Sequence, residues 1–194
     1  MASSPEDFNL EPLSRTQLLT AIALTAVVLL VVSRLWLLLD DVQRLPLTVS
    51  RIDTLLGLGL GLGITVSSTL VFATWPAYRR SAEFYLQFVL RPLHLPDVIW
   101  LGLLPGLSEE LLFRGVMLPA IGLTALGLMV SSLCFGVLHL SGWQQWPYVI
   151  WATIVGGILG GSAIATGNLW IPIVAHVSTN LLSSLFWKLR EDRA

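Results

Sequence analysis

The stretch Ser108-Glu109-Glu110-Leu111-Leu112-Phe113-Arg114 places two carboxylates and a guanidinium inside an apolar segment that covers residues 97–118. An ionisable side chain at membrane depth costs several kcal/mol unless it is paired or faces a wet cavity. On a helix Glu110 and Arg114 share a face, whereas Glu109 lies roughly 140° from Arg114 at about 100° per residue. The pattern predicts a local Glu110–Arg114 pair and leaves Glu109 without a counter-ion.

A buried ion pair that only orients helices is the simplest explanation for charge at this depth. Such a pair accounts for one acid and one base. It does not account for a second acid that has no partner nearby in the sequence. Glu109 is therefore a candidate functional residue.

The composition is that of an integral membrane protein. Of 194 residues, 55% are hydrophobic and 12% charged, and the mean hydropathy is +0.77, well above that of an average soluble domain. The formal net charge of -1 gives no basic footprint for nucleic acid, which is not an expected partner. The single cysteine, Cys134, has no partner for an intrachain disulfide.

The apolar segments predict an all-α polytopic membrane helix bundle with about six transmembrane helices. Residues 1–15 are expected to form a polar N-terminal tail, and residues 16–96 two transmembrane helices with a short interfacial helix within 78–96. Residues 97–188 are expected to form a four-helix core, followed by a basic tail at 189–194. The predicted spans are 16–39, 52–77, 97–118, 121–142, 147–167 and 169–188.

Glycines repeat at four-residue spacing in two of the predicted helices. The Leu-Gly alternation at 56–63 resembles a strand pattern, but the apolar run is too long for a strand. As small-xxx-small pairs, these glycines let a second helix approach closely. The predicted packing pairs are Gly57 with Gly61, Gly59 with Gly63, Gly156 with Gly160, and Gly157 with Gly161.

Six spans would place both chain ends on one side of the membrane, together with the 78–96 loop. Seven basic residues then lie on that side and three on the other, which favours cytoplasmic termini. We expect a multi-pass protein of the bacterial plasma membrane, with an organellar membrane as the alternative. The seven are Arg15, Arg79, Arg80, Arg91, Lys188, Arg190 and Arg193, and the three are Arg34, Arg44 and Arg51.

Two of the three histidines lie in apolar segments, each four residues from a second polar or aromatic residue. Phe135 and His139 share one helix face, as do His176 and Asn180. A carboxylate in an apolar site is a good base toward water, and a neutral imidazole can hold the water that it activates. An imidazole N–H and an amide NH2 on one face suit a developing oxyanion. Glutamate and histidine thus predict a hydrolytic pair, with no serine or cysteine nucleophile required.

Three motifs in this order, Glu109-Glu110-x-x-x-Arg114, Phe135-x-x-x-His139 and His176-x-x-x-Asn180, resemble those of the CPBP family of CAAX proteases and bacteriocin-processing (Abi) enzymes. The resemblance covers residues 97–188. It implies an intramembrane glutamic peptidase in which Glu109 is the base and His139 positions water. His176 and Asn180 would stabilise the oxyanion, with Glu110, Arg114 and Phe135 in support. No metal or other cofactor is implied.

Two other functions fit the same residues. Glutamate and two histidines are legitimate zinc ligands, although no H-E-x-x-H motif is present. A non-catalytic adaptor that holds the tail of a partner protein would also use such a pocket, and should tolerate glutamine at position 109. The expected partners are membrane lipids and a peptide or membrane-protein substrate, with or without a lipid group; the sequence does not define the oligomeric state.

The predicted depths of the site residues raise one difficulty. Glu109 lies roughly 18 Å into its segment at about 1.5 Å per residue, whereas His139 and His176 lie near opposite ends of theirs. Straight upright helices would keep the three apart. Kinks at Pro105 and Pro172 are expected to help bring them together.

Overall fold

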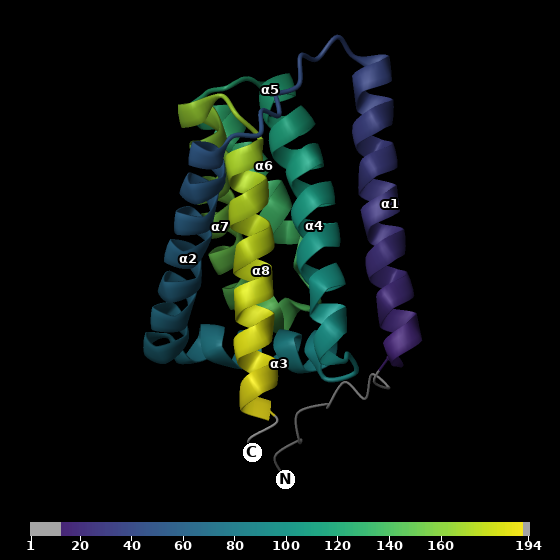
Figure 1. The fold of residues 1–194 in the computed structure, drawn as a ribbon, viewed down its shortest axis with the longest axis vertical. Helices are drawn as coiled ribbons and strands as arrows, with labels where there is room; N and C mark the ends of the chain where they lie inside the picture. Colours follow the sequence, from purple (N-terminus) through teal and green to yellow (C-terminus); the bar gives the residue numbers. More distant parts are fainter. Residues whose placement is uncertain (1–12, 192–194) are drawn as a thin grey trace.

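The computed structural model describes residues 13–191, in which all regular structure is helical, so the predicted all-α class is confirmed. Figure 1 shows the longer helices running along the long axis of the molecule, with one helix, α3, across one end. The elements are α1 (Arg15–Leu39), α2 (Arg51–Thr74), α3 (Pro76–Leu90), η1 (Leu95–Asp97), α4 (Val98–Leu112), η2 (Phe113–Met117), α5 (Leu118–Ile121), α6 (Ala125–Leu138), η3 (Trp143–Gln145), α7 (Trp146–Thr166) and α8 (Trp170–Glu191).

The helix α8 lies at the centre of the bundle, packed against both α2 and α4, while α6 packs against α7 and α1 contacts α4 at the edge. Small residues permit the closest of these contacts. A Cβ at Gly61 would lie 2.7 Å from the carbonyl oxygen of Ala175, and one at Gly106 would lie 2.6 Å from Val177. These glycines bring α2 and α4 against α8.

Only half of the predicted glycine pairs lie at helix contacts. Gly57 and Gly61 face α8, and Gly156 and Gly160 face α6 and Arg114, as their spacing predicted. In contrast, a Cβ added at Gly59, Gly63 or Gly161 would meet no neighbouring atom within 4 Å, and one at Gly157 would make only an ordinary contact. The prediction was wrong for Gly59, Gly63 and Gly161, because spacing does not show which face of a helix meets a neighbour.

Helix α3 lies across the end of the bundle and is the helix expected within 78–96. Pro76 begins it, at a position where the missing N–H would have no helical partner. Its buried side chains, Tyr78, Ser81, Ala82, Val89 and Leu90, fall on one face that packs on the bundle. The segment before it is shorter than predicted, because α2 ends at Thr74 and not at residue 77.

The segment 97–118 is not one regular helix. It begins as α4, changes to the π-helical turn η2 at Phe113 and continues as α5 to Ile121. The amide of Leu118 bonds to the carbonyl of Phe113, five residues back. Ser131 of α6 also donates to the Phe113 carbonyl, at 2.9 Å. Such turns occur often at functional sites, and this one begins three residues after Glu110.

Two other predicted boundaries differ. α6 begins at Ala125 and ends at Leu138, which makes it 14 residues long, so His139 is its C-cap and not part of a 121–142 span. α8 continues to Glu191, which overlaps the predicted 189–194 tail. The rest of that tail, and residues 1–12 of the predicted N-terminal tail, lie outside the described residues.

Within residues 13–191, three helices are long and apolar enough to cross a bilayer: Arg15–Leu39, Arg51–Thr74 and Trp143–Thr166. α6 is apolar but shorter. These helices, with the composition, identify an integral membrane protein. Of the other predicted spans, the one at 97–118 is interrupted where α4 ends at Leu112. The one at 169–188 lies in α8, which carries the polar residues His176 and Asn180.

The described chain ends lie at the same end of the bundle (Figure 1). Ser14 and Gln17 form a capping box that begins α1. The next residue, Arg15, donates two hydrogen bonds of 2.7 Å to Asp97, beside the start of α4. These bonds lower the pKa of Asp97 to about 2.

Asn168 joins three segments at the opposite end of the bundle. Its Oδ1 accepts from the amides of Thr48 and Trp170, each at 3.0 Å. Its Nδ2 donates to the carbonyl of Thr48 at 2.8 Å and to Asp53 at 3.1 Å. All four hydrogen-bonding positions of this buried amide are thereby used.

Candidate active site

Glu110 is completely buried in α4 and has two partners. Its Oε1 accepts from Arg114 at 2.7 Å and lies 2.8 Å from Nδ1 of His176. The pair with Arg114 is the one that the four-residue spacing predicted. The contact with His176, 66 residues away on α8, was not predicted. Glu110 is thus more than the neutralising partner of Arg114.

Arg114 is completely buried in η2 and bridges three elements. Besides Glu110, it donates to the carbonyl of Gly156 on α7, at 3.0 Å. Its guanidinium carbon lies 4.3 Å from the ring centroid of Phe135 on α6. A Cβ at Gly156 would lie 3.3 Å from the guanidinium, so the glycine leaves room for it. A planar cation with several donors suits this position better than lysine would.

Glu109 is also buried, at 7% exposure. Its Oε2 has no hydrogen-bond partner among the described residues, and lies 3.9 Å from Nε2 of His139. The other ring nitrogen of His139 is 2.9 Å from the carbonyl oxygen of Phe135. Since that oxygen only accepts, Nδ1 carries a hydrogen, and when the ring is neutral Nε2 is the acceptor nitrogen that faces Glu109.

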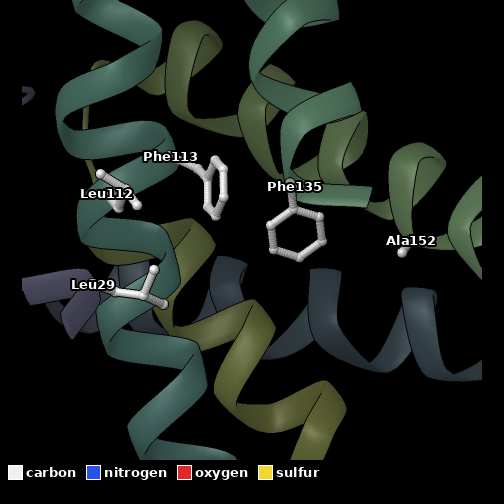
Figure 2. Packing of buried hydrophobic residues seen from close by; sticks show 5 residues of the cluster. All are labelled: Leu29, Leu112, Phe113, Phe135 and Ala152. Atoms are coloured by element: carbon white, nitrogen blue, oxygen red, sulfur yellow. The ribbon is translucent and has the colours of Figure 1, made fainter. Parts of the chain in front are cut away.

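Phe135 lies at the centre of these groups. Its ring centroid is 4.9 Å from that of His139 and 5.6 Å from that of His176. Figure 2 shows its ring next to that of Phe113, with which it makes an edge contact at 5.5 Å. Leu29, Leu112 and Ala152 complete this apolar cluster. The five residues of the cluster come from α1, α4, η2, α6 and α7.

The structure therefore assembles residues that the sequence placed at different depths. α6 is short, so His139 follows its last turn at the depth of Glu109. Pro172 has no part in this, because it lies in the first turn of α8, where proline fits without a kink. Pro105 lies inside α4, as the kink prediction required.

Asn180 follows His176 by one turn on α8 and is half-buried. No hydrogen bond joins its side chain to another residue within 13–191. Its amide is available to a ligand. For His176, the contact with Glu110 uses Nδ1, so only Nε2 can serve as the donor that the sequence predicted.

Tyrosines border the site beyond His139, and sequence reasoning missed them. The ring of Tyr148 on α7 lies 6.1 Å from that of His139 and 4.7 Å from that of Tyr85 on α3. Burial, together with the charge of Glu109, raises the pKa of Tyr85 to about 12. Their only sequence signal was that both lie in segments next to the predicted site helices.

In the described part of the chain, no three His, Cys, Asp or Glu side chains are grouped as metal ligands. The set considered for zinc was Glu109, His139 and His176. It is divided in the structure, because His176 is bonded to Glu110 and not to Glu109.

Comparison with known proteins identifies the region that holds the site. Residues 91–182 match the family described as type II CAAX prenyl endopeptidase Rce1-like. Similar curated proteins are the uncharacterized protein YpbD of Bacillus subtilis (strain 168), 29% identical over 120 residues, and an uncharacterized 24.3 kDa protein of Escherichia coli, 30% identical over 125 residues. The alignments cover 62% and 60% of this chain, and 61% and 57% of those proteins. No solved structure matches.

The matched region contains all seven residues of the three motifs, from Glu109 to Asn180. The chain spans about three fifths of the length of the curated relatives that it matches. Over residues 91–182, the chain is therefore similar to the family described as type II CAAX prenyl endopeptidase Rce1-like.

Proposed function

We propose that this protein is an intramembrane endopeptidase in which Glu109 activates water to hydrolyse a peptide bond. The observation that carries the proposal is the buried, unpaired Oε2 of Glu109, 3.9 Å from Nε2 of His139. The two atoms are too far apart for a direct hydrogen bond. Both are acceptors, so a single water between them donates one hydrogen to each. Glu109 then takes a proton as the water oxygen attacks the carbonyl carbon.

The donors for the resulting oxyanion are proposed to come from α8. The amide of Asn180 is free of other described residues, and Nε2 of His176 is the ring nitrogen not used by Glu110. Arg114 and Phe135 hold these groups in place without touching the substrate. In a site closed to bulk water, such donors stabilise the transition state more than they do in water.

The proposed substrate is a peptide segment of a membrane-borne polypeptide, which the family name suggests can carry a prenyl group. We also propose a six-pass topology with both termini in the cytoplasm of a bacterial cell. It is supported by the positions of the start of α1, of α3 and of the end of α8 at one end of the bundle (Figure 1). Cysteine labelling of the termini from the outside would disprove this topology.

The experiment compares membranes that contain the wild-type protein with membranes that contain Glu109→Gln, and maps new peptide termini by mass spectrometry. Glutamine keeps the shape but cannot take a proton, so termini made by the wild type should fall about 100-fold or more in the variant. Glu83→Gln, at an exposed position of α3, is the matched control and should cleave normally.

The same membranes decide between the alternatives. Equal cleavage by Glu109→Gln and the wild type would end the proposal. A partner protein that is retained equally by both, without cleavage, would indicate an adaptor. Loss of cleavage in a strong chelator, and its recovery with zinc, would indicate a metalloprotease.

A further inference from the structure

The two consecutive glutamates lie beside different histidines. Glu109 faces His139 at 3.9 Å, whereas Glu110 is within hydrogen-bond distance of His176, at 2.8 Å. His139 belongs to the end of α6 and His176 to α8, and both rings border Phe135. The site thus contains two Glu–His pairs, one too far apart for a direct hydrogen bond and one closed by a hydrogen-bond contact.

The closed pair fixes the orientation of the His176 ring. An ionised carboxylate has no hydrogen to give, so Nδ1 of His176 donates to Glu110. Nε2 is then the ring nitrogen of His176 that can interact with a bound substrate. A carboxylate that holds one nitrogen of an imidazole also stabilises the ring while the other nitrogen carries a proton.

The charges of the buried groups allow a proton at this position. Two carboxylates, Glu109 and Glu110, are enclosed with a single guanidinium, that of Arg114. Buried charges are costly unless they are balanced. A protonated imidazole would bring the group to zero net charge, and of the two rings only His176 is hydrogen-bonded to a carboxylate.

Cleavage of an amide requires an acid as well as a base. The base removes a proton from water, but the C–N bond breaks readily only when the leaving nitrogen receives a proton. We propose that the Glu110–His176 pair supplies it, with His176 as the catalytic acid and Glu110 as its positioning residue. This inference rests on the proposed peptidase function and adds proton transfer to the donor role of His176.

The step balances as follows in atoms and charge. Water adds to the carbonyl carbon and gives one proton to Glu109, which forms a tetrahedral oxyanion. As the C–N bond breaks, Nε2 of His176 gives its proton to the nitrogen, which leaves as an amine. Glu109 and the new carboxylic acid release two protons, of which one returns to His176 and one completes the ammonium product.

The test compares two versions of one synthetic, internally quenched decapeptide, made for the cleavage site mapped in wild-type membranes. One version has the natural amide at the scissile bond and the other an ester. An alcohol oxygen leaves with far less help from an acid than an amine nitrogen does. Losing the acid should therefore slow the amide much more than the ester, whereas losing an oxyanion donor should slow both alike.

His176→Gln keeps an N–H donor but cannot transfer a proton. We expect it to lower kcat for the amide by about 100-fold or more, and for the ester by less than about 10-fold. Asn180→Ala, the matched control, should slow both probes by the same factor. Equal slowing of both probes by His176→Gln would overturn the proposal, and would leave Glu109 to return its own proton to the nitrogen.

Glu110→Gln tests the positioning role, since glutamine can still accept from Nδ1 but no longer balances a protonated ring. It should shift the ratio of kcat for the amide to kcat for the ester in the same direction as His176→Gln. An unchanged ratio in a folded variant would remove Glu110 from the proposal. Failure of the wild type to cleave either probe would contradict the peptidase function itself, which keeps the two failures distinct.

Discussion

Replacing Arg114 by methionine should strongly destabilise the protein, because the arginine contacts buried groups on three elements. Methionine keeps the volume of the stem but removes the charge and the donors. Leaving Glu110 without its cation costs about 3–5 kcal/mol, and leaving the Gly156 carbonyl without a donor costs about 1–3 kcal/mol. The contact with the Phe135 ring contributes about 2 kcal/mol.

These terms overlap, since they belong to one side chain, and His176 remains beside Glu110. We therefore expect a total loss of about 4–6 kcal/mol, against a typical stability of about 5–15 kcal/mol. The assay is unfolding in mixed detergent micelles by titration with SDS, after measurement of the yield in membranes. Arg34→Ala, an exposed arginine of α1, is the control and should be within about 0.5 kcal/mol of the wild type.

A second variant separates loss of charge balance from loss of packing. Glu110→Gln combined with Arg114→Met removes both charges, so it should recover about 2 kcal/mol or more relative to Arg114→Met alone. If Arg114→Met unfolds within about 1 kcal/mol of the wild type, the arginine is not the structural cation that the geometry indicates.

Three further predictions concern positions outside the site. Gly61→Ala should lower stability by about 1–3 kcal/mol, because its Cβ would lie 2.7 Å from the Ala175 carbonyl, whereas Gly63→Ala, on the open face, should not; equal effects in SDS titration would contradict this packing. Asn168→Ala removes four hydrogen bonds and should cost about 2–4 kcal/mol in the same assay, and a neutral result would show that the hydrogen bonds of Asn168 are dispensable. The Arg15–Asp97 bridge lowers the pKa of Asp97 from 3.8 to about 2, so its stabilisation is complete above about pH 4 and is lost as the pH falls through about 2. Thermal unfolding over this range should show less acid sensitivity in Asp97→Asn, and identical pH profiles would refute the linkage.

The helical class, the membrane character and the residues of interest could all be predicted from the amino-acid sequence. Long apolar runs leave only helices as a means of satisfying the backbone in lipid, so composition and length were sufficient. Charges inside such runs are costly, which singled out the region around Glu109. The Glu110–Arg114 pair could also be predicted, because residues four apart on one helix are neighbours whatever surrounds them.

Which groups meet across helices could not be predicted from the sequence and became apparent from the packed helices. The bond between Glu110 and His176 joins residues 66 apart, and no local periodicity carries information about it. The helical faces of Gly61 and Gly63 differ in the same way, because spacing is identical for a buried and an open face. The π turn at Phe113 and the early end of α6 are also not encoded in local periodicity, and the early end of α6 leaves His139 within 3.9 Å of Glu109.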